Sequence, residues 1–257
     1  MSLEINYIGR LGNNILQYLM GQYLSHKFNL QFNTELESND DFIVHKTSGS
    51  KNYSCKVEVN DSNIFDIINT ENIKHGIHLN GYFHDRKIFE NKHIINFYKS
   101  RIIFKPLNGV SDLFAHVRLG DIDNRHNLPY EYYHEQIEKV PYEKCTISTD
   151  SPDHDIVKKL MSNFKNCNIL GDCSPSHALR YGANCNNLVL SPGTFSFCIA
   201  FFSLCDPDVY CIDNIILKEK FNRESWDGGV FTAFIGREKF NFYNRSLLEA
   251  IIKWLHL

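Results

Sequence analysis

Residues 113–121 read Leu-Phe-Ala-His-Val-Arg-Leu-Gly-Asp and carry the strongest fold signal in this chain. A strand that is apolar on both faces is typical of a parallel sheet covered by helices on both sides. His116 and Arg118 interrupt the run, and the two-residue period of a strand places them on the same face. Burying an unpaired guanidinium costs several kcal/mol. We therefore expect an anionic ligand at Arg118, and an ion pair between Arg118 and Asp121 that only closes the strand end is the alternative.

Outward from this stretch, strand-like runs alternate with helix-like segments. We expect strands at 113–118, 145–148, 168–170, 188–190 and 209–212, and helices at 130–140, 153–164, 175–181 and 194–204. Strands and helices that alternate through short connections predict a parallel α/β sheet. The C-terminal half is therefore expected to be a Rossmann-like nucleotide-binding unit, with an amphipathic helix at 246–257 closing the fold.

The N-terminal half is less regular. We expect strands at 3–8 and 77–83, helices at 15–24 and 88–98, a glycine loop at 9–13, and a loop with short strands at 34–63. Because the pattern changes near residue 105, the sequence predicts two domains, 1–105 and 106–257.

The composition limits the class of protein. Of the 257 residues, 43% are hydrophobic and 22% are charged, which excludes a disordered tail. The 27 Lys and Arg against 30 Asp and Glu give a net charge of -3, so we expect no nucleic-acid partner. The N-terminus lacks the pattern of a signal peptide, and the cysteines form no CxxC pair and are expected to be reduced thiols. These features predict a cytoplasmic protein, and peripheral association with a membrane stays open.

A second polar group follows the predicted strand at 145–148. Asp150 can accept two parallel N–H bonds, such as those that the edge of a guanine base offers. Thr149 precedes it, and Ser151 follows it at the start of the next helix. Capping of that helix is the alternative to a contact with a ligand.

A third group, Ser191-Pro-Gly-Thr-Phe-Ser196, lies between a predicted strand and a very apolar helix. The unpaired N–H groups and the dipole at a helix N-terminus attract anions, and simple capping is again the alternative. In open α/β sheets, ligands bind beyond the carboxyl ends of the strands, where all three groups are expected. Together they suit a nucleoside diphosphate. No GxxxxGK[ST] loop occurs, and residues 9–13 do not match GxGxxG, which disfavours P-loop enzymes and dehydrogenases.

Five motifs resemble those of one known family. Gly9-Arg-Leu-Gly-Asn13, followed by Gln17-Tyr18, is similar to the GxLGNQxFQY opening of the α-1,2-fucosyltransferases of glycosyltransferase family 11. Asn80-Gly-Tyr-Phe-His84 resembles that family's GYFQ, and His116-Val-Arg-Leu-Gly-Asp121 resembles its HxRRGD. Residues 148–151 and 191–196 are similar to its FSDD-like and SNSSFSWW-like segments, in the same order along the chain.

The resemblance implies an inverting, metal-independent transferase of GT-B-like architecture, with two Rossmann-like halves whose parallel sheets face a central cleft. It would take fucose from GDP-fucose, with no further cofactor, and place it on a galactose hydroxyl of a glycan in α-1,2 linkage. Residues 1–105 would hold the acceptor, and residues 106–257 would hold the GDP-sugar.

The resemblance also implies roles for single residues. Arg118 would contact the donor diphosphate, the segment 191–196 would hold the phosphates, and Asp150 would face the guanine. Asn13 would approach the donor from the N-terminal half. The predicted substrate-binding residues are Gly9, Gly12, His116, Thr149, Asp150, Ser191, Gly193, Thr194, Phe195 and Ser196.

The sequence departs from the family pattern at three places. Leu119 replaces the second arginine of HxRRGD, His84 replaces the glutamine of GYFQ, and Phe197 and Cys198 replace two tryptophans. By strand alternation, Leu119 points away from Arg118, so we expect the main phosphate contact to survive.

The chemistry requires a stabilised leaving group and, for inversion, a base for the acceptor hydroxyl. Arg118, Asn13, Asp121 and Asp123 are the predicted catalytic residues, with Asp121 or Asp123 as the base. Asp121-Ile-Asp123 also matches the DxD metal signature, but so do residues 153–155 and 206–208, and no metal is predicted. The alternatives are a metal-dependent transferase that uses another nucleotide sugar through Asp121 and Asp123, and a nucleotide-sugar or glycan-binding module without turnover.

Overall fold

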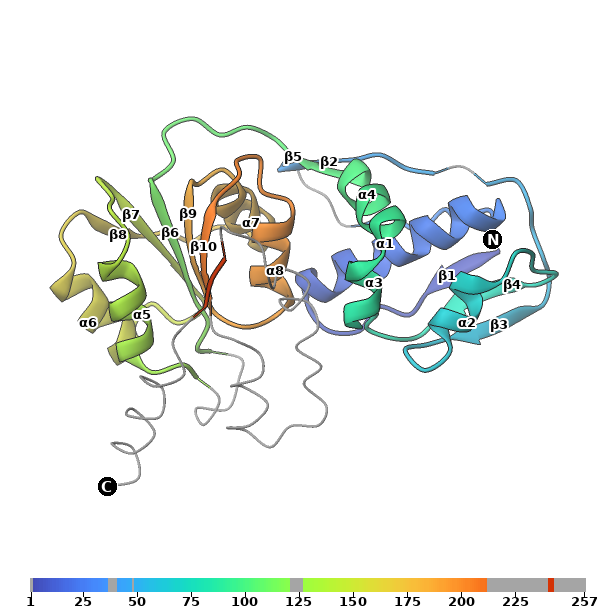
Figure 1. Cartoon of the computed structure of the whole chain (residues 1–257), viewed down its shortest axis with the longest axis horizontal. Coiled ribbons are helices and arrows are strands. Elements are labelled where there is room, and N and C mark those ends of the chain that lie inside the picture. The colour runs from blue at the N-terminus through green and yellow to red at the C-terminus, as the bar shows by residue number, and fades with distance from the viewer. Residues whose placement is uncertain (1, 37–40, 48, 121–126, 212–239, 243–257) are drawn as a thin grey trace, which may run out of the picture. The chain divides into compact units, whose positions relative to one another are not determined.

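The structure is a computed structural model, and it describes residues 2–36, 41–47, 49–120, 127–211 and 240–242 (Figure 1). The chain divides into two compact units, Met1–Lys105 and Pro106–Leu257. They are called the N-unit and the C-unit below. The acceptor-binding and donor-binding roles expected of the two halves remain predictions.

The C-unit contains a parallel sheet of six strands within the described ranges. Its strands are β6 (Leu113–Val117), β7 (Cys145–Thr149), β8 (Cys167–Ile169), β9 (Asn187–Leu190), β10 (Asp208–Cys211) and β11 (Phe240–Phe242). Their order across the sheet is β11-β10-β9-β6-β7-β8. This is a doubly wound order: successive strands are added on one side of β6 up to β8, and on its other side from β9 onward. The predicted α/β class with parallel sheets is confirmed.

Helices cover both faces of this sheet (Figure 1). The helices α5 (Tyr130–Glu138) and α6 (Asp155–Asn163) lie on one side, and α7 (Pro175–Ala183) and α8 (Thr194–Phe201) lie on the other. Right-handed crossovers place helices on opposite faces when the strand order reverses. Every strand and helix predicted between residues 113 and 211 is found, with ends up to three residues from those expected; for example, α6 begins at Asp155 instead of residue 153, and α8 ends at Phe201 instead of residue 204.

Strand alternation divides the side chains of β6 between the two faces. Ala115 and Val117 belong to the core that packs beneath α5 and α6, and Leu119 is 2% exposed in that same core. Phe114 faces the other side, where Gly182 of α7 lies so close that a Cβ there would stand 2.9 Å from the Phe114 ring. His116 faces that side as well. As predicted, Leu119 therefore points away from the face that carries His116.

The N-unit contains a smaller parallel sheet, with β1 (Leu3–Ile5), β4 (Gly76–Leu79) and β3 (Lys56–Val59) in that order across the sheet. A separate antiparallel pair is formed by β2 (Phe42–Val44) and β5 (Ile102–Phe104). The helices described in this unit are α1 (Leu11–Phe28), α2 (Ile64–Asn69), α3 (Arg86–Glu90) and α4 (Lys92–Arg101).

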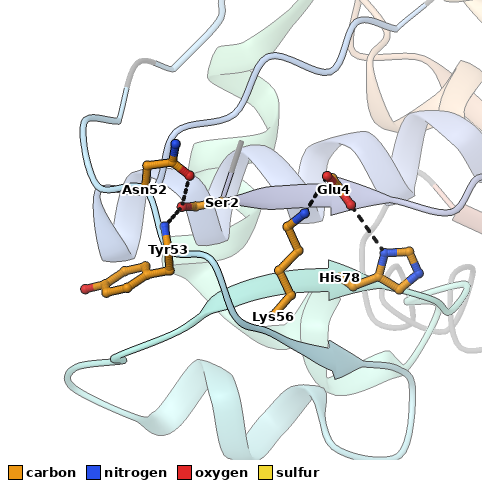
Figure 2. A network of polar contacts seen from close by, with 6 residues as sticks. All are labelled: Ser2, Glu4, Asn52, Tyr53, Lys56 and His78. Carbon is orange, nitrogen blue, oxygen red and sulfur yellow. Dashed lines mark hydrogen bonds and ion pairs between the residues drawn. The ribbon is translucent and has the colours of Figure 1, made fainter.

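The two faces of the N-unit sheet differ in polarity. On one face α1 packs directly on β1, because a Cβ at Gly21 would stand 2.9 Å from Ile5 Cδ1. Figure 2 shows the other face, where Glu4, Lys56 and His78 project toward one another from three adjacent strands. Lys56 Nζ lies 2.6 Å from Glu4 Oε1, and His78 Nδ1 lies 4.0 Å from Glu4 Oε2. This face remains partly open to solvent.

Four expectations for the N-unit need correction. The first strand ends at Ile5 instead of residue 8, and α1 begins at Leu11, inside the predicted glycine loop, with Arg10 as its N-cap. The strand predicted at 77–83 ends at Leu79. The helix predicted at 88–98 is two helices, because the Asn91 side chain accepts bonds from the N–H groups of residues 93 and 94 and starts α4 anew.

The closing helix predicted at 246–257 lies outside the described residues. In the part of the chain that the structure describes, none of the helices has the length and apolar character needed to cross a bilayer.

Candidate functional site

The carboxyl ends of β6, β7 and β9 bring the three predicted groups to one edge of the C-unit sheet. Arg118 follows β6, Asp150 follows β7, and Ser191 follows β9 just before α8. Because β6 and β9 are neighbours, the edge above them is the switch point at which open α/β sheets bind ligands.

The Ser191 hydroxyl connects the ends of β9 and β6, and all of its hydrogen-bonding capacity is used. Its Oγ donates to the His116 carbonyl oxygen at 2.6 Å and accepts from the Arg118 N–H at 2.9 Å. The Tyr133 hydroxyl lies 2.7 Å away and must be the donor there, since the Ser191 hydrogen already points to a carbonyl. Ser191 is also only 1% exposed. The Ser191 hydroxyl thus positions the strand ends, and the role of Ser191 in holding the phosphates stays a prediction.

Two tyrosines of α5 support this arrangement, and the sequence reasoning missed them. The Tyr132 hydroxyl donates to the Leu190 carbonyl oxygen at 2.8 Å, and Tyr133 donates to Ser191. Burial raises the pKa of Tyr133 above its usual range, so the hydroxyl keeps its proton at neutral pH. The sequence signal that could have identified these two residues is a pair of adjacent tyrosines in the helix after the first strand of the C-unit.

The first turn of α8 holds the His116 side chain in place. Its Nδ1 lies 2.6 Å from Ser196 Oγ, and its ring centroid lies 5.0 Å from that of Phe195. Ser196 is fully buried. Its hydroxyl orients the imidazole, and its role in holding the phosphates stays a prediction.

The guanidinium of Arg118 lies against the start of α8. A Cβ at Gly193 would stand 2.8 Å from Arg118 Nη1, and Gly193 has a φ of +125°, a conformation that side chains rarely adopt. Gly193 is also the N-cap of α8, so no side chain caps the helix at that position. A positive side chain thus adjoins the positive end of a helix, with Thr194 and Phe195 as the first helical residues. Both features favour an anion at this point.

Asp150 and Thr149 shape the adjacent turn. Asp150 Oδ1 accepts from the N–H groups of Leu119 at 2.8 Å and Gly120 at 2.9 Å. Thr149 Oγ1 accepts from the Ser151 N–H at 3.1 Å. A Cβ at Gly120 would stand 2.6 Å from Ser151 Oγ, so a side chain there would require the Ser151 hydroxyl to move. The contact of Asp150 with a guanine remains a prediction.

The predicted bases Asp121 and Asp123 lie outside the described residues, as does the ion pair considered between Asp121 and Arg118. Within the ranges that the structure describes, no group of three or more His, Cys, Asp or Glu side chains is placed to hold a metal ion.

The N-unit has its own loops at the carboxyl ends of β1 and β4. Gly9 has a φ of +84°, and a Cβ there would overlap the side-chain amide of Asn13 in the first turn of α1, where Gly12 is buried. Gln17 is fully buried; its Oε1 accepts from the Ile8 N–H at 3.1 Å, and its Nε2 donates to the carbonyl oxygens of Ile8 at 3.2 Å and Gly81 at 3.0 Å. The Gln17 amide therefore replaces, at Ile8, the strand pairing that was expected there, whereas the Asn6 N–H still donates to the Leu79 carbonyl oxygen at 2.8 Å.

The loop after β4 is held by Asp61 and contains His84. The Asp61 carboxylate accepts from the N–H groups of Tyr82 at 2.8 Å and Phe83 at 2.5 Å. Phe83 has a φ of +56°, so the chain is not extended at this residue. Burial lowers the pKa of His84 to about 4, although the charge of Asp61 opposes this change. His84 Nε2 is buried and has no hydrogen-bond partner among the described residues.

Comparison with known proteins identifies solved structures of similar shape and no sequence family. No protein-family model and no curated protein matches the sequence. The E. coli heptosyltransferase WaaC with ADP superposes with a TM-score of 0.40 and 12% identity, over 63% of this chain and 48% of WaaC. The fucosyltransferase NodZ from Bradyrhizobium superposes with a TM-score of 0.39 and 12% identity, over 54% of this chain and 56% of NodZ. The chain thus matches about half the length of each of these proteins.

Proposed function

We propose that the chain is an inverting glycosyltransferase that moves fucose from GDP-fucose to a galactose hydroxyl of a glycan, forming an α-1,2 linkage. The nucleoside diphosphate is supported by the geometry of the C-unit edge. The sugar, the acceptor and the linkage rest on the motif resemblance at residues 9–18, 80–84, 116–121, 148–151 and 191–196. The cytoplasmic location expected from the sequence belongs to this proposal.

One observation carries the proposal. At the switch point between β6 and β9, the Arg118 guanidinium adjoins Gly193, the N-cap of α8. A guanidinium and a helix N-terminus that meet at one point both attract an anion. The diphosphate of a nucleotide sugar supplies two phosphates for these two positive centres.

The reaction that this site supports is a displacement at the anomeric carbon. The acceptor oxygen forms a bond to that carbon while the bond from the carbon to the diphosphate oxygen breaks, and GDP leaves with the electron pair. Arg118 and the α8 amides stabilise the negative charge that grows on the leaving diphosphate. The proton of the acceptor hydroxyl goes to a base, for which Asp121 and Asp123 remain the candidates.

Binding of GDP to the Arg118→Ala variant tests the proposal. The variant is expected to bind GDP about 10- to 100-fold more weakly, the effect of losing charge-assisted hydrogen bonds worth about 1.5–3 kcal/mol. The measurement is titration calorimetry with GDP, UDP and ADP. Arg86→Ala is a matched control, because Arg86 is an exposed arginine of the N-unit that pairs with Glu90. Unchanged GDP affinity in a folded Arg118→Ala variant would sink the assignment.

A transfer assay with GDP-fucose and a galactoside then tests the chemistry. Release of GDP together with a fucosylated product is the expected result. Tight GDP binding without transfer or hydrolysis would instead indicate a binding module. Activity that vanishes with a chelator and returns with manganese would favour the metal-dependent transferase.

A further inference from the structure

We propose that Asp150 is a positioning residue of the anion site. Its carboxylate holds the turn formed by Leu119 and Gly120, called the β6 turn here, and thereby sets the place of Arg118; it does not read the nucleotide base. The inference rests on the proposed function in one respect, namely that the anion is the diphosphate of a nucleotide.

The first step is the geometry of the β6 turn. Both N–H groups of the turn donate to the same oxygen of Asp150, at 2.8 Å from Leu119 and 2.9 Å from Gly120. Gly120 also approaches Asp150 closely, since a Cβ there would stand 3.2 Å from Asp150 Cγ. A carboxylate oxygen that accepts two backbone N–H bonds has used both of its lone pairs.

The second step follows from that saturation. To read a guanine edge, a carboxylate must offer one free lone pair on each of its two oxygens, because the two N–H groups of the base lie side by side. Oδ1 of Asp150 has none left. A guanine at this position would have to displace a backbone N–H group and leave it without a partner, which costs about 1–3 kcal/mol.

The third step connects the β6 turn to Arg118. The N–H of Arg118 donates to Ser191, and the next two N–H groups along the chain donate to Asp150. Arg118 is therefore held on one side from β9 and on the other side from β7. Its guanidinium fits beside Gly193 with no room for a Cβ, so a shift of a few tenths of an ångström in the β6 turn changes its contact with α8.

The same type of contact occurs at the opposite edge of the sheet and provides a control. Asp112, just before β6, accepts with Oδ2 from the N–H groups of Glu143 at 2.9 Å and Lys144 at 3.0 Å, just before β7. Asp112 thus connects the amino ends of β6 and β7. Asp150 connects the carboxyl ends of the same two strands. Only Asp150 is close to Arg118, so only its loss should weaken anion binding.

The experiment compares Asp150→Asn, Asp150→Ala and Asp112→Ala by titration calorimetry with two probes, GDP and inorganic pyrophosphate. In Asp150→Asn the side-chain amide oxygen can still accept both N–H bonds and carries no charge. This variant is therefore expected to bind both probes within about threefold of the natural protein, and Asp150→Ala to bind both about tenfold more weakly, a loss of about 1.4 kcal/mol. Asp112→Ala should leave both affinities unchanged.

A different pattern overturns the inference. If Asp150→Asn loses GDP affinity tenfold or more and keeps pyrophosphate affinity, Asp150 reads the base. If Asp112→Ala weakens the binding of both probes as much as Asp150→Ala does, the effect comes from the general stability of the C-unit, and the positioning role of Asp150 is excluded.

A second measurement needs no ligand. Hydrogen exchange of the peptide that contains the β6 turn is expected to be faster in Asp150→Ala and unchanged in Asp150→Asn, because the latter keeps the acceptor. Unchanged exchange in Asp150→Ala overturns the inference whatever the affinities are. If the natural protein binds neither probe, the proposed function fails, and the exchange data still decide whether Asp150 holds the turn.

Discussion

The two sheets are both parallel, yet they are covered differently. In the C-unit, β6 and its neighbours are buried on both faces, beneath α5 and α6 on one side and α7 and α8 on the other. In the N-unit, β1 and β4 alternate, with Leu3 and Ile77 fully buried but Glu4 and His78 partly exposed. Among the residues that the structure describes, the alternating strands leave one face partly exposed, so alternation in this parallel sheet marks its more polar face.

The carboxyl edges of the two sheets also differ in charge. Buried polar side chains hold the loops at both edges, Gln17 in the N-unit and Ser191 in the C-unit. At the C-unit edge the functional groups are the Arg118 guanidinium and the start of α8. At the N-unit edge they are the Asn13 amide and His84, which is neutral at pH 7 because its pKa lies at about 4. The C-unit edge therefore places a positive side chain beside a helix N-terminus, whereas His84 at the N-unit edge carries no charge at pH 7.

The largest expected effect on stability comes from Gln17→Ala. The change removes the partners of one N–H and two carbonyl groups, and each unpaired buried group costs about 1–3 kcal/mol. We expect the N-unit to lose about 2–4 kcal/mol of free energy of unfolding. Hydrogen exchange measured by mass spectrometry reports this loss separately for each unit.

Gln136→Ala is the matched control in the C-unit. Gln136 is 1% exposed, but its Nε2 has no hydrogen-bond partner among the described residues. Its removal should cost less than half as much as the removal of Gln17. Equal losses would mean that filling space, and not the three hydrogen bonds, is what Gln17 contributes.

The next effect is a pH dependence at His84. The pKa of its side chain is about 4 in the folded chain against 6.5 in the unfolded chain. As the pH falls below 6.5, the unfolded state binds the proton first, so stability is lost between pH 6.5 and pH 4. His84→Gln removes this loss, and the stability of the natural protein relative to the variant should fall by about 2 kcal/mol from about pH 7 to about pH 4.5.

Denaturation by urea at several pH values measures this difference. His93→Gln, the same change at an exposed position of α4, is the control. Parallel pH profiles of the natural protein and His84→Gln would show that His84 ionises freely and would remove the contrast in charge between the two edges.

Gly193→Ala tests the C-unit edge. The new Cβ would meet Arg118 Nη1 at 2.8 Å in a strained backbone, so we expect a loss of about 1–2 kcal/mol in stability and at least tenfold weaker GDP binding. Two controls separate the effect of the contact with Arg118 from the effect of backbone strain. Gly109→Ala adds a side chain at a φ of +74° with nothing within 4 Å, and Gly171→Ala adds one in open space. If Gly109→Ala weakens GDP binding equally, the contact with Arg118 is not the reason.

Glu4→Gln should have the smallest effect. The hydrogen bond from Lys56 lowers the pKa of Glu4, so its contribution is present above the ordinary value of 4.5 and is lost as the pH falls. The Glu4 side chain is 41% exposed, and pairs of this kind contribute about 0.2–1 kcal/mol. Urea denaturation at low and high salt measures the contribution. A loss above about 2 kcal/mol would show that this sheet face is covered in solution.

Much of the C-unit could be predicted because its signals are local. The period of two in residues 113–119 places His116 on one face and Leu119 on the other, and this prediction was correct. The ends of elements in the N-unit could not be predicted, because they depend on distant partners. Residue 8 leaves the first strand since Gln17 pairs with its backbone, and β4 ends where Asp61 binds the next loop.

The sequence by itself determined the alternation of strands and helices, the α/β class, and the face of β6 that carries His116, because these follow from the periods of the backbone. Only the tertiary structure decided which polar groups remain available to a ligand. Ser191 and Asp150 lie 73 and 31 residues from the N–H groups that they bind, and the strand order brings them there. A hydroxyl or carboxylate oxygen has few lone pairs, so those that hold the fold are not available to hold a substrate.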